Sequence, residues 1–328
     1  MTKRCVIVGA GVSGLLAANK LISAGWEVVI FDGGREVGGR MATRRVGGGT
    51  FDHGAQFFTA RSEKFKDLVA TWVKFGAARE WSRGFADAEG NHNRDGYPRY
   101  RGSRGMASVP KFLARGLDVR TSERVAGITR LNGGWEVRVE SGEKEAADAA
   151  LMTPPVPQSL ALVGGEVPTC KREELRDISY DPCVALMAVL DGPAELPEPG
   201  GVQIKGEPLD WVSDNDRKGI SEVPSLTIHA GPKWSRRNFD APDVEVSASL
   251  LHFTEEILGK DFASKVVETS AARWRYSWVT QGCPERFFVA VEDPPLVFAG
   301  DAFGEPKVEG ASLSGLAAAE WIAERSRS

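Results

Sequence analysis

The stretch RCVIVGAGVSGLLAANKLISAGWEVVIFD, residues 4–32, decides the fold class of this chain. It begins with an apolar, strand-like run at 4–8, passes through three glycines, and then places apolar residues at helical spacing as far as Gly25. A second apolar run at 27–31 ends on Asp32. The order of strand, tight turn, helix and strand predicts a right-handed βαβ crossover of about thirty residues.

The turn of this unit carries a GxGxxG pattern with Gly9, Gly11 and Gly14. The first glycine permits the tight turn, the second lets a pyrophosphate approach the backbone, and the third lets helix and strand pack closely. The start of the helix offers unpaired N–H groups and the positive end of its dipole to a phosphate. Asp32, eighteen residues after Gly14, can accept hydrogen bonds from a ribose. This context predicts a dinucleotide site, and a glycine-rich turn without a ligand is the alternative.

The residues that follow Asp32 indicate a longer cofactor than a simple NAD domain would hold. Gly38 and Gly39 supply flexible backbone, and Arg40 supplies a guanidinium directly before Met41. Such a segment suits a second phosphate or the ring end of a folded-over cofactor. A solvated loop is the alternative interpretation of so short a pattern.

The C-terminal region is predicted to complete the same nucleotide-binding layer. A buried strand at 295–299 ends in Gly300-Asp301, and a helix is predicted from about Ala311 to Arg325. The turn at 309–311 would open this helix. Its dipole could then stabilise negative charge on a redox ring bound beside it.

Between these ends, the chain mixes strand patterns with one clear helix at 243–258. Strands are predicted within 117–140 and at 149–153, 183–190, 225–230 and 287–291. We therefore expect an α/β fold in which a Rossmann-type dinucleotide-binding domain is interleaved with a mixed-sheet substrate domain. The first domain is assigned residues 1–60, 102–160 and 290–328, and the second residues 61–101 and 161–289.

Length and composition limit the class of protein. The chain has 328 residues and a net charge of −4, which leaves no basic excess for binding nucleic acid. No apolar run approaches the ~20 residues that span a bilayer. Cysteines at 5, 170, 183 and 283 form no CxxC pair, which argues against zinc and against a disulfide framework. We expect a cytoplasmic protein with no metal site and no nucleic-acid or membrane partner; its oligomeric state is left open.

Several segments resemble known flavoproteins. The GGRM at the end of 35–41 resembles the second flavin signature of the amine oxidase superfamily. Segments spread over the whole chain resemble the bacterial renalases specifically: FDHGAQFFTAR (51–61), LDWVSDNDRKG (209–219), HAGPKWSRRNFD (229–240), RWRYSW (273–278) and FAGDAFGEPKVEGASLSG (298–315).

The resemblance implies noncovalent FAD in a two-domain fold like that of p-hydroxybenzoate hydroxylase. It also implies oxidation of the 2- and 6-dihydro isomers of NAD(P)H to NAD(P)+ by hydride transfer to flavin N5, with O2 reduced to H2O2. No cysteine follows Cys283, which disfavours a covalent thioether near the C-terminal motif. Carried onto this chain, the FAD contacts fall on Gly9, Gly11, Val12, Gly14, Asp32, Gly39, Arg40, Met41, Gln56, Phe57, Val125, Asp301, Glu309, Gly310 and Ala311.

The substrate side is less defined by the sequence. His229 lies in a renalase-like segment and is the candidate for positioning a reduced nicotinamide, with a satisfied structural histidine as the alternative. Stacking surfaces for a planar ring could come from Trp211, Trp234, Trp274 and Trp278. Oxidation of small amines is the second enzyme hypothesis. A non-catalytic FAD-binding redox sensor is the third.

Overall fold

The computed structural model describes residues 2–93, 95–204 and 206–325. The chain divides into two compact units. Unit 1 comprises Met1–Gly39, Val109–Ser179 and Val279–Ser328, and unit 2 comprises Arg40–Ser108 and Tyr180–Trp278. The two units are therefore interleaved along the sequence.

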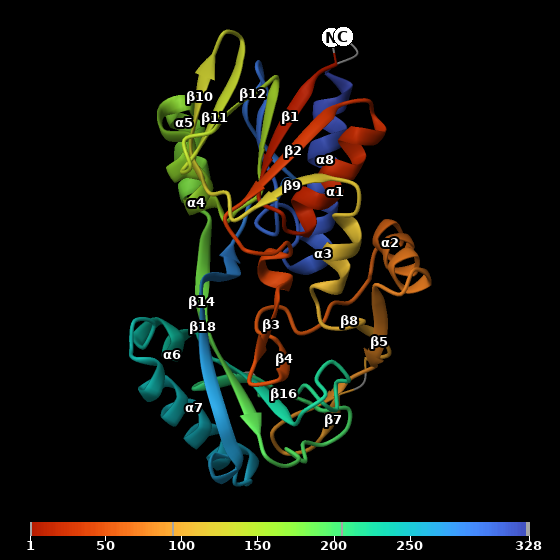
Figure 1. Ribbon diagram of the computed structural model, residues 1–328, viewed down its shortest axis with the longest axis vertical. Coiled ribbons are helices and arrows are strands. Elements are labelled where there is room, and N and C mark those ends of the chain that lie inside the picture. The colour runs from red at the N-terminus through yellow and green to blue at the C-terminus, as the bar shows by residue number, and fades with distance from the viewer. Residues whose placement is uncertain (1, 94, 205, 326–328) are drawn as a thin grey trace. The chain divides into compact units, whose positions relative to one another are not determined.

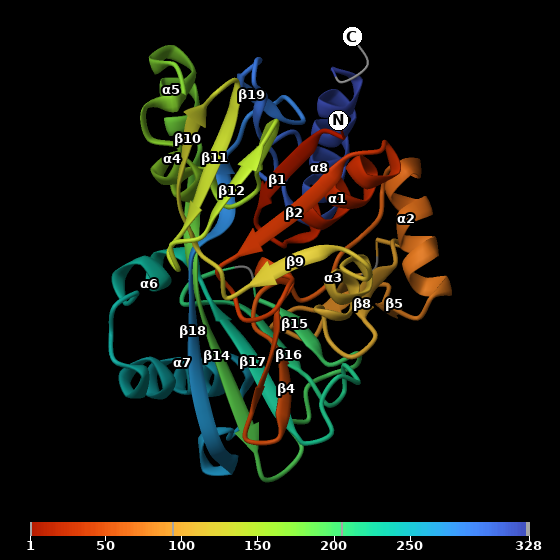
Figure 2. The ribbon, with the colours of Figure 1, turned by 45° about the horizontal axis from the view of Figure 1, so that its top comes forward.

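Unit 1 is built on a sheet with the strand order β19-β20-β13-β1-β2-β9. Strand β1 pairs in parallel with β2 and β13, and Figure 2 shows β1, β2 and β9 in this order. A separate antiparallel sheet contains β10, β11 and β12. The elements are β1 (Arg4–Val8), α1 (Val12–Ser23), β2 (Glu27–Asp32), α3 (Ser108–Leu113), β9 (Asp118–Thr121), β10 (Val125–Leu131), β11 (Gly134–Val139), β12 (Lys144–Ala147), β13 (Ala149–Met152), α4 (Val156–Val163), η2 (Gly164–Glu166), α5 (Thr169–Arg176), β19 (Phe288–Val291), β20 (Leu296–Phe298) and α8 (Lys307–Glu324).

The predicted βαβ crossover is present, and its first strand has the predicted bounds. Strand β1 is buried from Cys5 to Val8, as expected for a parallel strand covered on both faces. Helix α1 buries Leu15 and Leu21 completely. Gly25 follows the helix with a φ of +88°, the left-handed conformation that commonly ends a helix at glycine.

Helix α8 begins at Lys307, four residues before the start predicted at Ala311. The residues Glu309, Gly310 and Ala311 therefore lie inside the first turns of the helix and do not form a turn before it. The glycines of this segment weaken its helical signal, but packing requires them. An added Cβ at Gly315 would lie 2.2 Å from the carbonyl oxygen of Ser13 in α1. The two helices run side by side at this contact (Figure 1).

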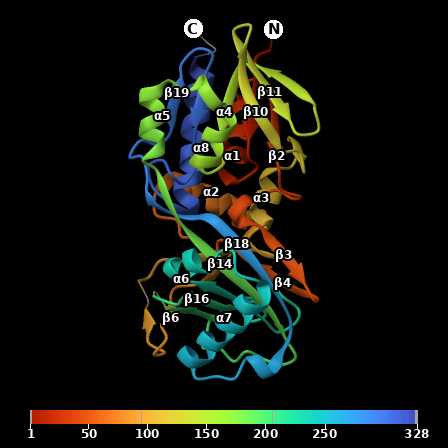
Figure 3. The same ribbon diagram turned by 90° about the vertical axis from the view of Figure 1, so that its left-hand side faces the viewer.

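Unit 2 is built on a mixed sheet with the strand order β18-β14-β17-β16-β15-β6-β7. Helix α7 buries Leu250 among sheet residues such as Val184 and Ile228, and Figure 3 shows α6 and α7 next to this sheet. The elements are η1 (Gly39–Met41), β3 (Thr43–Val46), β4 (Gly49–Asp52), α2 (Glu63–Lys74), β5 (Ala78–Ser82), β6 (Phe85–Ala86), β7 (His92–Asn93), β8 (Arg99–Gly102), β14 (Ser179–Leu190), β15 (Gly201–Gln203), β16 (Leu209–Asp214), β17 (Ser225–Ala230), α6 (Pro232–Arg237), α7 (Asp243–Leu258), η3 (Ala263–Lys265) and β18 (Val266–Gln281). None of the helices in the described part of the chain is both long and apolar enough to cross a membrane.

The unit boundaries differ from the predicted domain boundaries. Residues 40–60 were assigned to the dinucleotide-binding domain, but they belong to unit 2, where Phe51 packs into the core beside strand β14. Residues 161–179 and 279–289 were assigned to the substrate domain, but they belong to unit 1, where Lys171 donates to the carbonyl of Val289. Hydrophobic periodicity indicates that a segment is buried, but it does not identify the sheet that buries it.

Replacing Gly315 by alanine tests the contact between α1 and α8. The added Cβ would meet a backbone oxygen at 2.2 Å, so the helices must move apart and unit 1 loses packing. We expect the free energy of unfolding to fall by about 1–3 kcal/mol, measured by thermal unfolding. Gly165→Ala is the matched control, because none of the described residues beyond its chain neighbours lies within 4 Å of its added Cβ. Equal stabilities of the two variants would contradict this packing argument.

Candidate functional site

The turn between β1 and α1 is closed by two glycines that the backbone itself requires. Gly9 has a φ of +99°, and its N–H donates to the carbonyl of Phe31 at 2.8 Å. An added Cβ at Gly14 would lie 2.1 Å from the carbonyl oxygen of Gly9. Helix and strand therefore approach as closely as the GxGxxG pattern predicts.

Gly11 has no such reason to be glycine. Its φ of −76° and ψ of 176° are open to any residue, and apart from its chain neighbours no described residue lies within 4 Å of an added Cβ. It is also the N-cap of α1, where no side chain caps the free N–H groups. Open space beside uncapped helix N–H groups fits the pyrophosphate of a dinucleotide.

The second glycine motif folds back onto this turn. The N–H of Gly38 donates to the carbonyl of Ala10 at 2.9 Å. An added Cβ at Gly39 would lie 3.8 Å from the Cα of Gly11, and Gly39 has a φ of +53°. The structure thus brings together two motifs that the sequence separates.

Asp32 lies at the carboxyl end of β2 and holds the same turn. Its carboxylate accepts hydrogen bonds from the N–H groups of Ala10 and Gly34, each at 2.6 Å. The main chain of Asp32 and Gly34 in turn accepts from Glu123 and Ser122. These bonds tie the loop after β2 to the segment that leads into β10, where Val125 is buried.

Thr153, at the end of strand β13, supports the turn, although the sequence pattern indicated only that a strand ends there. Its hydroxyl donates to the carbonyl of Val8 at 2.8 Å. Thr153 follows Met152, which is paired with Val8 in the parallel register. The sequence signal for this role was a threonine at the end of a predicted buried strand. Only the parallel register of β13 with β1 places this threonine next to Gly9.

Asp301 and the start of α8 complete the carboxyl edge of the sheet. Strand β20 neighbours β13 and ends at Phe298, and the N–H of Gly300 donates to the Ser314 hydroxyl at 2.9 Å. Glu309 and Ala311 are buried in the first turns of α8. The ends of β1, β2, β13 and β20 therefore carry Gly9, Asp32, Thr153 and Asp301 along one edge. Ligands of open parallel sheets bind at this edge.

The other predicted cofactor contacts lie in unit 2. The Arg40 guanidinium faces the carbonyl oxygens of Tyr276 and Ser277 at 3.3 and 3.4 Å. Met41 is buried. Phe57 packs against Phe85 with ring centroids 4.9 Å apart.

Unit 2 contains a polar cluster in which Asp52, His53, Gln56 and Lys218 are buried and His229 is partly exposed. Lys218 Nζ lies 2.7 Å from the Asp52 carboxylate, and neither side chain is exposed to solvent. Burial lowers the pKa of Lys218, and the Asp52 charge opposes this shift. No local sequence pattern indicates this pair, because 166 residues separate its members.

Gln56 connects the ion pair to His229. Its amide oxygen accepts from Ser213 at 2.9 Å and from Lys218 at 3.4 Å. Its amide nitrogen faces His229 Nε2 at 3.2 Å and also donates to the carbonyls of Asp52 and Gly54. The hydrogen-bonding capacity of this side chain is therefore used within unit 2.

Both histidines of the cluster are neutral at pH 7. Burial, together with the nearby His53 and Lys218, lowers the pKa of His229 to about 3. Burial and the Arg44 charge lower the pKa of His53 to about 4. His53 also stacks on Trp274 with ring centroids 5.1 Å apart. With one carboxylate, one ammonium and two neutral imidazoles, the cluster carries no net charge.

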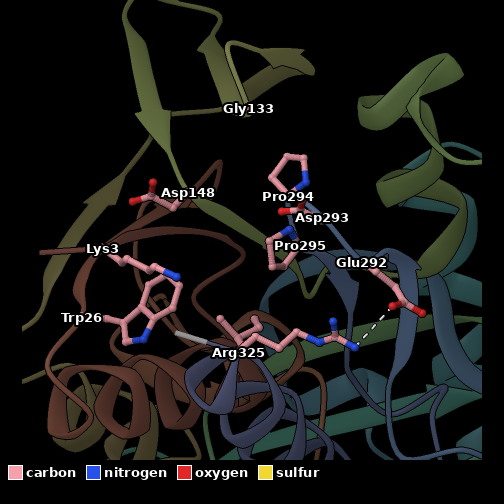
Figure 4. Close-up of a pocket in the computed structure, with 10 residues that line it drawn as sticks. Lys3, Trp26, Gly133, Asp148, Glu292, Asp293, Pro294, Pro295 and Arg325 are labelled. Atoms are coloured by element: carbon pink, nitrogen blue, oxygen red, sulfur yellow. Dashed lines mark hydrogen bonds and ion pairs between the residues drawn. The ribbon is translucent and has the colours of Figure 1, made fainter. Parts of the chain in front are cut away.

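A separate pocket of about 290 Å³ lies in unit 1 (Figure 4). Its lining includes Lys3, Trp26, Asp148 and Pro295, which precede or begin the strands β1, β2, β13 and β20. It therefore lies at the amino ends of the parallel strands, where dinucleotides do not bind in open α/β sheets.

A parallel sheet with this glycine turn defines a nucleotide-binding protein of Rossmann type. Residues 7–72 match the sequence model of an NAD(P)-binding Rossmann-like domain. The chain belongs to the family of flavin-containing amine oxidoreductases, whose sequence model matches residues 74–323. It is an FAD-dependent oxidoreductase, as the sequence predicted.

Full-length relatives agree with this family. Renalase of Mus musculus is 27% identical, over 95% of this chain and 96% of its own. A putative protoporphyrinogen oxidase from Exiguobacterium sp. superposes with a TM-score of 0.77 and 15% identity over 99% of each chain. A putrescine oxidase mutant redesigned in its cofactor binding gives a TM-score of 0.76 at 16% identity, again over 99% of each chain. These likenesses confirm the predicted α/β fold.

Gly11→Ala tests whether the open side of the turn is kept for a ligand. Apart from its chain neighbours, the methyl group contacts none of the residues that the structure describes, so the unfolding midpoint without cofactor should not change. It would occupy the space of the pyrophosphate, so FAD affinity should fall about tenfold or more. Titration of flavin fluorescence measures this loss, with Gly165→Ala as control. Unchanged FAD affinity would show that the turn does not hold the diphosphate.

Acid should destabilise the fold through His53 and His229. Both are neutral when folded, with pKa values of about 4 and about 3, whereas an unfolded histidine titrates near ~6.5. Below pH ~6.5 the unfolded chain binds more protons, so stability falls as the pH falls. Between pH 7 and 5 we expect a loss of about 2 kcal/mol per histidine, measured by urea unfolding.

Two variants separate this effect from other titrations. His229→Gln should remove its share of the pH dependence. His252→Gln should not, because that side chain is 63% exposed. Identical pH dependence in wild type and His229→Gln would rule out the linkage.

Proposed function

We propose that this FAD-dependent oxidase converts the 2- and 6-dihydro isomers of NAD(P)H to NAD(P)+. The similarity to renalase over 95% of the chain supports this substrate class. The reaction balances, because a hydride leaves the nicotinamide and joins O2 with one proton to give H2O2. Bound FAD supplies the two-electron chemistry that links the two halves.

Unit 1 is proposed to hold FAD noncovalently along its carboxyl edge. Gly11, Val12 and the N–H groups of α1 would take the diphosphate, with Gly39 beside them. Asp32 would accept from a ribose and Asp301 from the ribityl chain. The other proposed contacts in this unit are Gly9, Gly14, Val125, Glu309, Gly310 and Ala311. All four cysteines are free, which fits a reducing compartment such as the cytoplasm.

Unit 2 is proposed to contribute Arg40, Met41 and Phe57 to the cofactor and to carry the substrate-binding residues. Gln56 has used its amide groups on protein partners, so its proposed flavin contact would be made by main-chain atoms or by packing. His229 is proposed to position the substrate side. Trp274, supported by the stacked ring of His53, offers a planar surface for nicotinamide.

The observation that favours a dihydronicotinamide over an amine is the neutrality of the polar cluster. Hydride transfer from a reduced nicotinamide needs a held donor carbon and excluded water, but no protein base. A cationic amine would call for a carboxylate partner. The only carboxylate of the cluster, Asp52, is already paired with Lys218 at 2.7 Å.

Amine oxidation remains the second candidate, because the chain belongs to the amine oxidoreductase family and shares its fold with putrescine oxidase. The family match alone does not distinguish the two substrates. A redox sensor without turnover is the third possibility.

Anaerobic stopped-flow mixing of the FAD-loaded protein distinguishes the three. We expect the flavin absorbance to bleach promptly with the 2- and 6-dihydro isomers and to return with one peroxide per substrate when O2 is added. Ordinary 4-dihydro NADH and putrescine serve as controls. Bleaching by amines alone would replace the proposal with amine oxidation. If none of these compounds bleaches the tightly bound FAD, the redox-sensor hypothesis remains.

A further inference from the structure

The orientation of the Gln56 amide is fixed by its partners. The ammonium of Lys218 carries only donors, and it lies 3.4 Å from the amide oxygen while paired with Asp52 at 2.7 Å. The Ser213 hydroxyl donates to the same oxygen at 2.9 Å. A flipped amide would point its NH2 group at a cation. The NH2 group must therefore face the other side, toward His229.

This orientation determines which nitrogen of His229 carries the proton. Nε2 lies 3.2 Å from the amide nitrogen of Gln56, whose two hydrogens are shared between Nε2 and the carbonyl oxygens of Asp52 and Gly54. A proton on Nε2 would meet a group that can only donate, so Nε2 is the unprotonated nitrogen. In a neutral imidazole, the proton is on Nδ1.

The His53 main chain is the partner expected for that proton. It raises the pKa of His229, as an accepting carbonyl near a donating ring nitrogen does. Because Nε2 faces Gln56, the ring nitrogen available to this carbonyl is Nδ1. The same carbonyl accepts from Trp274 Nε1 at 2.8 Å.

We propose that Gln56 is a positioning residue that locks His229 as the neutral Nδ1–H tautomer, so that the ring links the Asp52–Lys218 pair to the His53 carbonyl and steadies the His53–Trp274 stack. The locked tautomer adds a positioning role to the proposed function, and its importance for catalysis rests on that function. His229 then holds a surface in place and moves no proton during turnover.

The groups around His229 favour this neutral state. His53 comes from the segment after β4, and Lys218 from the segment after β16; both disfavour a second positive charge. Asp52 is the nearest carboxylate of the cluster, and Lys218 neutralises it. A protonated His229 would therefore have no free anionic partner within the cluster.

The tautomer can be read directly from the full-length, FAD-loaded protein. The chain has only four histidines, so ¹⁵N-histidine labelling gives few side-chain signals, and His229→Phe assigns the one in question. We expect Nδ1 to be protonated and Nε2 unprotonated from pH 8 to pH 5. A proton on Nε2, or a doubly protonated ring in this range, would overturn the proposal.

Gln56→Glu tests the lock. At pH 8 the carboxylate can only accept, so we expect the His229 proton to appear on Nε2 and the imidazole pKa to rise by about 1–3 units. Gln281→Glu makes the same chemical change at an exposed site in unit 1 and should leave the His229 signals unchanged. A folded Gln56→Glu protein with an unaltered Nδ1–H pattern would refute the lock. If this variant does not fold, the wild-type spectrum still decides the tautomer.

The measurement needs no substrate, so it is independent of the proposed reaction. A confirmed tautomer with no bleaching by dihydronicotinamides would reject the proposed function and keep the lock. Bleaching of the flavin by dihydronicotinamides together with an Nε2–H tautomer would keep the proposed function and reject the lock.

Discussion

The close approach of α1 to β1 is the constraint on which unit 1 depends. Only a residue without Cβ can place position 14 against the carbonyl oxygen of Gly9. This contact puts the uncapped start of α1 directly above the end of β1. Backbone hydrogen bonds then attach the Gly38 segment and the Asp32 carboxylate to the same turn, and the Thr153 hydroxyl holds it from β13. The requirement for glycine at position 14 thus brings the Gly38 segment, Asp32 and Thr153 together at the carboxyl edge of the sheet.

Unit 2 depends on a different interaction, the buried pair of Asp52 and Lys218. Two charges removed from water are costly unless hydrogen bonds satisfy their remaining capacity. Thr43 and the N–H of Met106 donate to Asp52, and Lys218 also lies 4.8 Å from the ring of Trp81. Breaking the pair would leave a buried charge, so the cluster behaves as a unit. Its neutrality at pH 7 is the observation on which the proposal of a substrate that needs no base rests.

Local patterns predicted much of the fold. Strands β1 and β17 and helix α7 have the predicted bounds, because their apolar periodicity is decided by residues close in sequence. The start of α8 was placed too late, because its glycines lower helix propensity while serving a tertiary contact. The segment 40–60 was assigned to the dinucleotide-binding domain but belongs to unit 2, since local patterns predict that it is buried but not which elements it packs against.

The sequence by itself determined the glycine turn, the acid at the end of the second strand, and a family resemblance that spans the chain. Each of these features depends on short segments, in which neighbouring residues must adopt a specific backbone conformation. Only the tertiary structure decided that Thr153 supports the turn, that Lys218 pairs with Asp52, and that Gln56 joins this pair to His229. The physical reason is that these contacts connect residues far apart in the chain, and their strength comes from burial, which no local pattern encodes.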